Sequence, residues 1–291
     1  MVRANPRRTQ PFVSVILPTI GRAELRQAVQ SLVKSDYAAF EVLIVYDPER
    51  RGSTVARNVG LMLAQGNFVH FAEDDCIYEV GTLHALMQKY QQTIAQDSNC
   101  AGIVGCFKPP VWGGIAVRIN ITVSPEGLRI TPILGEGSTD YLATGNTLCS
   151  KQAILQCGGF NERYAHMFED LELSLVLKHE GMKLYNCRAA VAEHLNAPRL
   201  ESQVPLKRSP YLRVRNSILL HRTWCGNPVW YTIRQASSNL HRSFSNRTSM
   251  MSEQGPDRSA ERRRAIDIVS YGFGAIAGLT SGTARKGIKA A

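Results

Sequence analysis

The chain has 291 residues, of which 44% are hydrophobic, 20% charged and 8% aromatic. This composition is typical of a soluble globular protein and excludes a disordered or fibrous chain. The length is about twice the ~150 residues of a typical domain, so one large α/β domain with appendages and two small domains both remain open.

The formal net charge of +10 comes from one part of the chain. Residues 1–196 carry 18 basic and 19 acidic side chains, whereas residues 197–291 carry 16 basic and 5 acidic ones. A basic excess is compatible with nucleic acid, an anionic membrane or an acidic small substrate as partner. The excess of basic residues therefore lies in the C-terminal part of the chain, residues 197–291.

Cysteines and apolar segments indicate a cytoplasmic protein. The seven cysteines are an odd number with no C-x-x-C pair, which favours neither a disulfide framework nor a structural zinc site. The apolar run Phe12–Leu17 is too short for a signal peptide. Ala265–Gly278 falls short of the ~20 residues that a membrane-spanning helix needs. We therefore expect a reducing compartment and no transmembrane anchor.

Strands and helices alternate at the start of the chain. The hydrophobic pattern predicts strands at Phe12–Leu17, Val42–Val45 and Phe68–Ala72, and helices at Ala23–Lys34 and at Thr54–Ala64, the latter capped by Ser53. Such alternation is typical of a doubly wound, mostly parallel α/β sheet, in which ligands bind beyond the carboxyl ends of the strands.

The remaining pattern divides the chain into two domains. Residues 107–143 are typical of a β-hairpin, Ser150 caps a short helix ending at Gln156, Glu169–Glu180 is helical, and Met182–Asn186 and Ala190–His194 are strand-like. Basic amphipathic helices follow at Tyr211–Trp224 and Pro228–Ser243, with a mobile link at 245–258 and a last helix from Ala260. We predict a catalytic domain at 11–196 and a mainly helical extension at 197–291.

Three adjacent carboxylates, Glu73, Asp74 and Asp75, follow the predicted strand Phe68–Ala72. Like charges at this spacing repel one another unless a cation or solvent compensates them. A divalent metal is therefore a natural occupant, and a solvated loop is the alternative.

Several short motifs occur in the order that family 2 glycosyltransferases show. Val13–Arg22 resembles their "P-T-Y-N-R" loop, Arg57–Gly60 with Ala64–Gly66 their "R-N-x-G … A-x-G" helix, Glu73–Asp75 their Asp-x-Asp, and Gly158–Gly181 their "GGF-D-E … E-D-x-D-L … G" segment. The resemblance covers most of residues 12–196. It implies a GT-A fold, a nucleotide-diphosphate sugar donor, a divalent metal and inversion at the anomeric carbon.

The resemblance also implies roles for individual residues. Asp75 and Glu73 would hold Mn²⁺ or Mg²⁺ on the donor diphosphate, with His194 completing the metal shell unless it is structural. Asp170 matches the general base that accepts the proton of the acceptor hydroxyl, and Glu169 would orient it.

Further matching positions would line the donor and the acceptor. Those for the nucleotide and diphosphate are Pro18, Thr19, Arg22, Asp47, Arg57 and Asp74; Gly145 and Asn146 would lie beside the acceptor and donor sugar. A structural ion pair for Arg57 and a turn for Gly145-Asn146 explain these residues equally well. Ile20-Gly21 and Tyr46 depart from the family pattern, so UDP, dTDP and GDP all remain open as the nucleotide. Glu73 departs from the usual Asp but is also a hard oxygen ligand for a metal.

The basic extension has its own resemblance. Pro210–Asn216 is similar to the "Y-x-x-R-N" helix of family members that assemble bacterial polysaccharides on lipid-linked acceptors. Cations interleaved with Trp and Tyr suit a peripheral site on an anionic membrane, and a solvated face explains them as well. A nucleic-acid-binding protein is a less favoured alternative because it leaves the carboxylates without a purpose, and an inactive scaffold that binds sugar nucleotides is a third.

Overall fold

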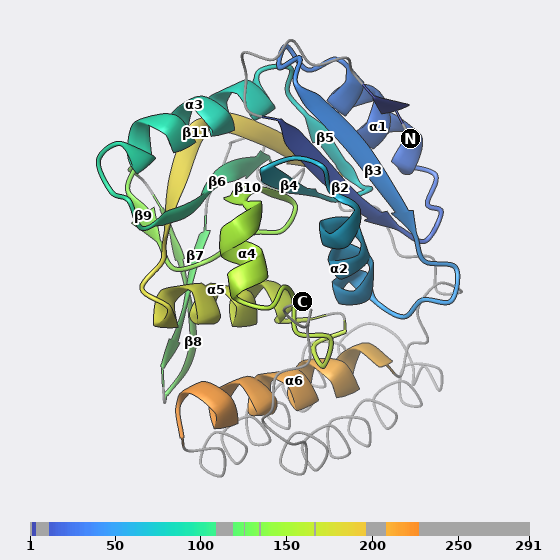
Figure 1. The fold of residues 1–291 in the computed structure, drawn as a ribbon. Coiled ribbons are helices and arrows are strands. Elements are labelled where there is room, and N and C mark those ends of the chain that lie inside the picture. Colours follow the sequence, from blue (N-terminus) through green and yellow to red (C-terminus); the bar gives the residue numbers. More distant parts are fainter. Residues whose placement is uncertain are drawn as a thin grey trace, which may run out of the picture. The chain divides into compact units, whose positions relative to one another are not determined.

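A mixed β-sheet organises the computed structural model of this protein, which describes residues 2–3, 12–108, 119–124, 126–133, 135–165, 167–195 and 208–226 (Figure 1). The strand order is β1 (Val2–Arg3), β3 (Phe40–Tyr46), β2 (Val13–Thr19), β4 (Phe68–Ala72), β10 (Asn146–Ser150), β6 (Cys100–Lys108), β11 (Lys183–His194) and β5 (Cys76–Tyr78), with β9 (Ser138–Thr139) beside β11. The longest pairings, β2 with β3 and β6 with β11, are parallel. The expected α/β class is confirmed.

One edge of this sheet collects the ends of five strands. β10 runs antiparallel to both of its neighbours, β4 and β6, so these two strands share one direction with β2, β3 and β11. Their carboxyl ends therefore lie at the same edge, where ligands bind in open α/β sheets. The first residue of β10, Asn146, is paired with Ala72 at the end of β4 and reaches the same edge.

Helices cover both faces of the sheet. On one face, alternate residues of β2 (Val13, Val15 and Leu17) share a buried core with α1 (Leu25–Val33) and α3 (Thr82–Ile94). On the other face α2 (Ser53–Leu63) lies so close to β2 that a Cβ added to Gly60 would stand 2.4 Å from Ile16 Cγ2. The alternation of buried side chains along β2 thus accounts for the three-layer arrangement.

Some of the predicted strand bounds and helix caps are confirmed and others are wrong. β4 has the predicted bounds, and Ser150 does cap α4 (Lys151–Gln156) by accepting a hydrogen bond from the Ala153 amide. The predicted cap Ser53 is wrong: Gly52 is the N-cap of α2, and Ser53 is the first helical residue. The two predicted strands at 182–194 are the single strand β11, which pairs with β6 through a register shift between Asn186 and Val191.

The described residues belong to two units. Unit 1 holds the sheet, its helices and α5 (Glu169–His179). Unit 2 holds α6 (Arg208–Trp224) and Val123–Arg129, the tip of the hairpin formed by β7 (Ile119–Ser124) and β8 (Gly127–Pro132). Val214 and Ile218, four residues apart and so on one side of α6, are buried. The predicted boundary at 196–197, the link 245–258 and the helices after residue 227 lie outside the described residues.

Two general features of the described chain bear on the sequence analysis. All seven cysteines are free thiols, and six of them are buried. Among the helices that the structure describes, none combines the length and apolar character needed to cross a membrane.

Candidate functional site

The loop between β4 and β5 brings the acidic triplet to the carboxyl edge of the sheet. The Thr19 hydroxyl, at the end of β2, donates a 2.6 Å hydrogen bond to Asp74 Oδ2. Arg22 Nη1 lies 2.7 Å from Asp75 Oδ2 and 3.5 Å from Asp74 Oδ1. The chain reaches Arg22 through Gly21, whose φ of +86° is accessible mainly to glycine. The structure thus brings together four of the predicted residues, while Pro18 lies one residue earlier, opposite Val45.

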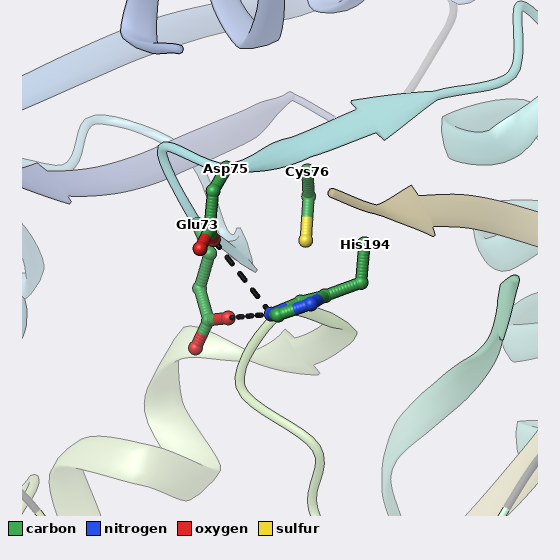
Figure 2. A group of neighbouring side chains, drawn as sticks. All are labelled: Glu73, Asp75, Cys76 and His194. Atoms are coloured by element: carbon green, nitrogen blue, oxygen red, sulfur yellow. Dashed lines mark ion pairs between the residues drawn. The ribbon is translucent and has the colours of Figure 1, made fainter. Parts of the chain in front are cut away.

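A second group of side chains lies beside the first (Figure 2). His194 Nε2 is 3.5 Å from Glu73 Oε2 and 3.7 Å from Asp75 Oδ1. The sulfur of Cys76 belongs to the same group, and the four donor atoms all lie within 4.8 Å of one another. His194 was predicted to meet these carboxylates, and the structure places it there. Cys76 was not predicted.

Burial and neighbouring charges act in opposite directions on these carboxyl groups. Burial raises the pKa of Glu73, but the hydrogen bond with His194 and the positive charge of Arg57 outweigh it, so this pKa lies below its usual value. Burial also raises the pKa of Asp74, and here the raising effect prevails despite Thr19 and Arg22. Glu73 therefore stays ionised, as a ligand for a cation requires.

The donor set fits a divalent cation. Carboxylate oxygens and an imidazole nitrogen are ligands for Mn²⁺, Mg²⁺ and Zn²⁺. The side chains of Glu73 and His194 are 31% and 28% exposed and so accessible to an ion from solvent, whereas that of Asp75 is 10% exposed. Glu73, Asp75 and His194 are the residues that would hold the metal.

Arg57, on α2, links the acidic loop to α5. Its guanidinium lies 3.0 Å from Glu169 Oε1 and 3.3 Å from Glu73 Oε1, and it stacks over the ring of Phe160. Ser53 donates a second hydrogen bond to the same Glu169 oxygen. Arg57 is 2% exposed. This geometry is that of the structural ion pair, the alternative to nucleotide binding that the sequence left open.

Asp170 lies in the first turn of α5. The Tyr141 hydroxyl donates a 2.5 Å hydrogen bond to Asp170 Oδ2. Burial, followed by the negative charge of Glu169, raises the pKa of Asp170 to about 7, although the Tyr141 hydrogen bond acts in the opposite direction. The preceding Phe168 has a φ of +67°, a strained conformation of the kind that accumulates at functional sites. A carboxyl group with this pKa can accept a proton near neutral pH. Tyr141 was missed by the sequence analysis.

The other predicted residues lie at the same edge in different roles. Asp47 follows β3; its Oδ2 accepts a hydrogen bond from the Gly52 amide, and its buried Oδ1 has no hydrogen bond within the described residues. The carbonyl of Gly145 accepts a hydrogen bond from Tyr78. Asn146 is completely buried and donates to the carbonyls of Cys106 and Ala190. Its amide therefore ties strands together, and the position beside the sugar that the resemblance implies for Asn146 stays a prediction.

Comparison with known proteins places this geometry in context. No family model matches the chain. The solved structure of GalNAc-T7 with UDP, GalNAc and Mn²⁺ is similar in fold, with a TM-score of 0.57 and 13% identity over 89% of this chain and 55% of that one. The fold is GT-A. The predicted resemblance to glycosyltransferases of this fold is thereby confirmed.

A sequence relationship points the same way. The GT-A chain is 26% identical over 229 residues to a pre-mycofactocin glycosyltransferase of Mycobacterium tuberculosis, in strains CDC 1551 / Oshkosh and ATCC 25618 / H37Rv. The match covers 67% of this chain and 45% of each relative, so the chain spans less than half the length of these relatives. The roles of individual residues stay predictions.

Proposed function

We propose that this GT-A protein is a metal-dependent, inverting glycosyltransferase, which transfers a sugar from a nucleotide diphosphate to an acceptor hydroxyl. The proposal is supported by four side chains whose donor atoms lie close enough to hold a metal ion, together with Asp170, a carboxyl group whose pKa is near 7. Relatives named as glycosyltransferases and a neighbouring structure with UDP and Mn²⁺ support it.

The donor end of the proposed site combines one cation, Arg22, with carboxylate oxygens that can bind a metal ion or accept hydrogen bonds. Arg22 lies beside the acidic loop and is 16% exposed, so it can meet a diphosphate that approaches from solvent. Asp47 follows β3; its Oδ1 accepts no hydrogen bond within the described residues, lies 4.0 Å from Arg51 Nε, and would receive a hydrogen bond from the nucleoside. Mn²⁺ or Mg²⁺ held by Glu73, Asp75 and His194 would neutralise charge on the diphosphate leaving group.

Asp170 would be the general base. It takes the proton of the acceptor hydroxyl while that oxygen forms a bond to the anomeric carbon from the face opposite the diphosphate. The bond between the anomeric carbon and the diphosphate oxygen breaks in the same step, and configuration inverts. Tyr141 donates a hydrogen bond to Oδ2 of Asp170. Arg57 and Ser53 both bind Glu169, which places a second negative charge beside Asp170.

The acceptor is proposed from the resemblance of Pro210–Asn216 to enzymes of surface-polysaccharide assembly. In this proposal a saccharide or lipid-linked saccharide is the acceptor, and the basic extension docks on the inner face of an anionic membrane. Removal of residues 197–291 then weakens binding to anionic vesicles more than binding of nucleotide. Equal sedimentation before and after truncation contradicts the membrane part of the proposal alone.

A thermal-shift screen tests the central proposal. The full chain is melted with UDP, dTDP and GDP, and with their sugars, each with Mn²⁺, Mg²⁺ or EDTA. A ligand that binds the native state raises the midpoint by mass action, and we expect one nucleotide to do so only with metal. Nucleotide sugars that bind are then assayed for transfer or slow hydrolysis, and NMR of the product reports the anomeric configuration.

Two variants separate an enzyme from an inactive scaffold. Asp170→Asn is expected to keep metal-dependent donor binding and to lose turnover, because an amide accepts no proton. Asp75→Asn is expected to lose the metal-dependent binding itself. The proposal fails if no nucleotide diphosphate binds with either metal and no nucleotide sugar is hydrolysed.

A further inference from the structure

Cys76 adds a soft donor to an otherwise hard cation site. Carboxylate oxygens suit Mg²⁺ and Mn²⁺, whereas a thiolate beside an imidazole suits Zn²⁺. The role proposed above for Glu73, Asp75 and His194 needs no sulfur, so the presence of Cys76 among them calls for a separate account.

The strand register places Cys76 beside His194. β5 and β11 are antiparallel, and Cys76 is the direct partner of His194 in that ladder. Directly opposed residues project their side chains to the same side of a sheet, with Cβ atoms about 4.5–5.5 Å apart. The backbone hydrogen bond from the Leu195 amide to the Asp75 carbonyl, 2.9 Å, extends the same alignment into the acidic loop. The sulfur is thus held in the group by backbone pairing.

The spacing of the donors is close to that of a tetrahedral zinc site. Zn–O and Zn–N bonds of about 2.0–2.1 Å put neighbouring ligand atoms roughly 3.3–3.4 Å apart, and a Zn–S bond of about 2.3 Å extends this to roughly 3.5 Å. His194 Nε2 already lies 3.5 Å from Glu73 and 3.7 Å from Asp75. Because all four donor atoms lie within 4.8 Å of one another, no pair exceeds its spacing in a tetrahedral zinc site by more than about 1.5 Å.

Access and charge also fit an ion at this position. Cys76 is completely buried, whereas the side chains of Glu73 and His194 are partly exposed. Figure 2 shows the sulfur of Cys76 directed toward the His194 ring. Arg57 and Arg22 pair with Glu73 and Asp75 and offset the negative charge that three anionic ligands would leave on the divalent ion.

We propose that Cys76 is a fourth ligand and that Glu73, Asp75, Cys76 and His194 bind Zn²⁺ as a closed, four-residue site. On binding, the Zn–S bond forms and the thiol proton passes to solvent. A filled tetrahedral shell leaves no coordination position for a diphosphate, so Zn²⁺ would inhibit the glycosyltransferase by competing with Mn²⁺ or Mg²⁺. The inhibition rests on the proposed function, whereas the four-ligand site does not.

Metal binding to the full chain tests the proposal without an activity assay. Zn²⁺ and Mn²⁺ affinities are measured by calorimetry and by electron paramagnetic resonance for the wild type, Cys76→Ser and Cys76→Ala. Cys187→Ser is the matched control, because Cys187 is also a buried thiol and lies on the same strand as His194 but outside the group. Co²⁺ serves as the spectroscopic probe, since a cobalt–thiolate bond produces a charge-transfer absorption in the near ultraviolet.

We expect the wild type and Cys187→Ser to show the charge-transfer band and both Cys76 variants to lack it. Loss of one ligand in four should weaken Zn²⁺ binding by at least ~100-fold, the upper end of what outer-shell changes cost, with Mn²⁺ affinity unchanged. Absence of the band in the wild type overturns the proposal even if the variants fail to fold, as does unchanged Zn²⁺ affinity in well-folded Cys76 variants.

The same measurements distinguish this proposal from the proposed function. In one outcome the protein binds Mn²⁺ together with a nucleotide diphosphate, but its Co²⁺ form shows no cobalt–sulfur band. That outcome overturns Cys76 as a ligand and leaves the proposed glycosyltransferase function intact. A sulfur-dependent Zn²⁺ site in a protein that binds no nucleotide with any metal supports the cysteine ligand and overturns the enzyme.

Discussion

The protonation of Asp170 should control the pH dependence of turnover. Burial and the charge of Glu169 raise its pKa to about 7, from an ordinary value of 3.8. A base acts only when ionised, so kcat/KM should fall about tenfold for each pH unit below 7. At pH 5 about 1% of Asp170 would be ionised, whereas an unperturbed aspartate would be about 94% ionised.

Two substitutions should move this acidic limb in opposite directions. Tyr141→Phe removes a hydrogen bond that favours the ionised form, so the pKa of Asp170 and the limb should rise. Glu169→Gln removes a like charge, so both should fall. The limb is read from initial rates of transfer or hydrolysis with the donor that the screen identifies.

Spectroscopy tests the same pKa without a substrate. In protein labelled with ¹³C at the aspartate carboxyl, the resonance missing from Asp170→Asn should titrate near pH 7. The free energy of unfolding provides a second test of this pKa. The native state keeps the Asp170 proton at pH values where the unfolded chain has lost it. The wild type should therefore lose stability relative to Asp170→Asn as the pH rises from about 4 to 7. A resonance titrating near 4 would refute the role assigned to burial.

Three further substitutions probe the fold and the site. Arg57→Met should lower the free energy of unfolding by about 3–5 kcal/mol, because it leaves Glu73 and Glu169 without their shared cation; a urea midpoint equal to that of the wild type would contradict this. His194→Ala should weaken Mn²⁺ binding, measured by electron paramagnetic resonance, without lowering the melting temperature in EDTA; equal affinity would remove His194 from the ligand set. Gly60→Ala should cost about 1–3 kcal/mol through its clash with Ile16, and the double variant with Ile16→Val should recover part of this loss in urea titrations.

The parts of the fold that were predicted are those where local pattern and packing agree. The predominantly apolar strands β2 and β4 are buried over most of their length, and β3 is buried over its first four residues, so all three stand out in the sequence as short hydrophobic runs. Once these strands are parallel, their carboxyl ends must share an edge. Thr19, Arg22 and the acidic triplet meet for that reason, and their meeting could be predicted without coordinates.

β6 and its pairing were missed for a physical reason. Gly102 and Gly105 weaken the strand pattern of Cys100–Lys108, and neither signals a turn. Both serve a close approach instead: an added Cβ would stand 2.6 Å from Cys149 Sγ at Gly102 and 2.3 Å from the Asn146 amide at Gly105. Such a requirement exists only once β10 lies beside β6, so local sequence does not carry it.

Cys76 and Tyr141 were missed because register and tertiary packing, not spacing, bring them to the site. Cys76 meets His194 across 118 positions of chain through the β5–β11 ladder. Tyr141 approaches Asp170 from the segment before β10. The residues that directly follow the parallel strands could be predicted from topology. Cys76, on the edge strand β5, and Tyr141, in the segment before β10, could not.

Arg57 connects the two halves of the proposed chemistry. One guanidinium group holds Glu73, which belongs to the cation site, and Glu169, whose neighbour Asp170 is the proposed base. Because Arg57 is buried and lies on a helix packed against β2, it fixes both carboxylates relative to the sheet. A single cation therefore limits the repulsion within the acidic loop and also holds Glu169, the charge that raises the pKa of Asp170, in its position. Loss of Arg57 should for this reason impair donor binding and proton transfer together, whereas loss of His194 should impair only the first.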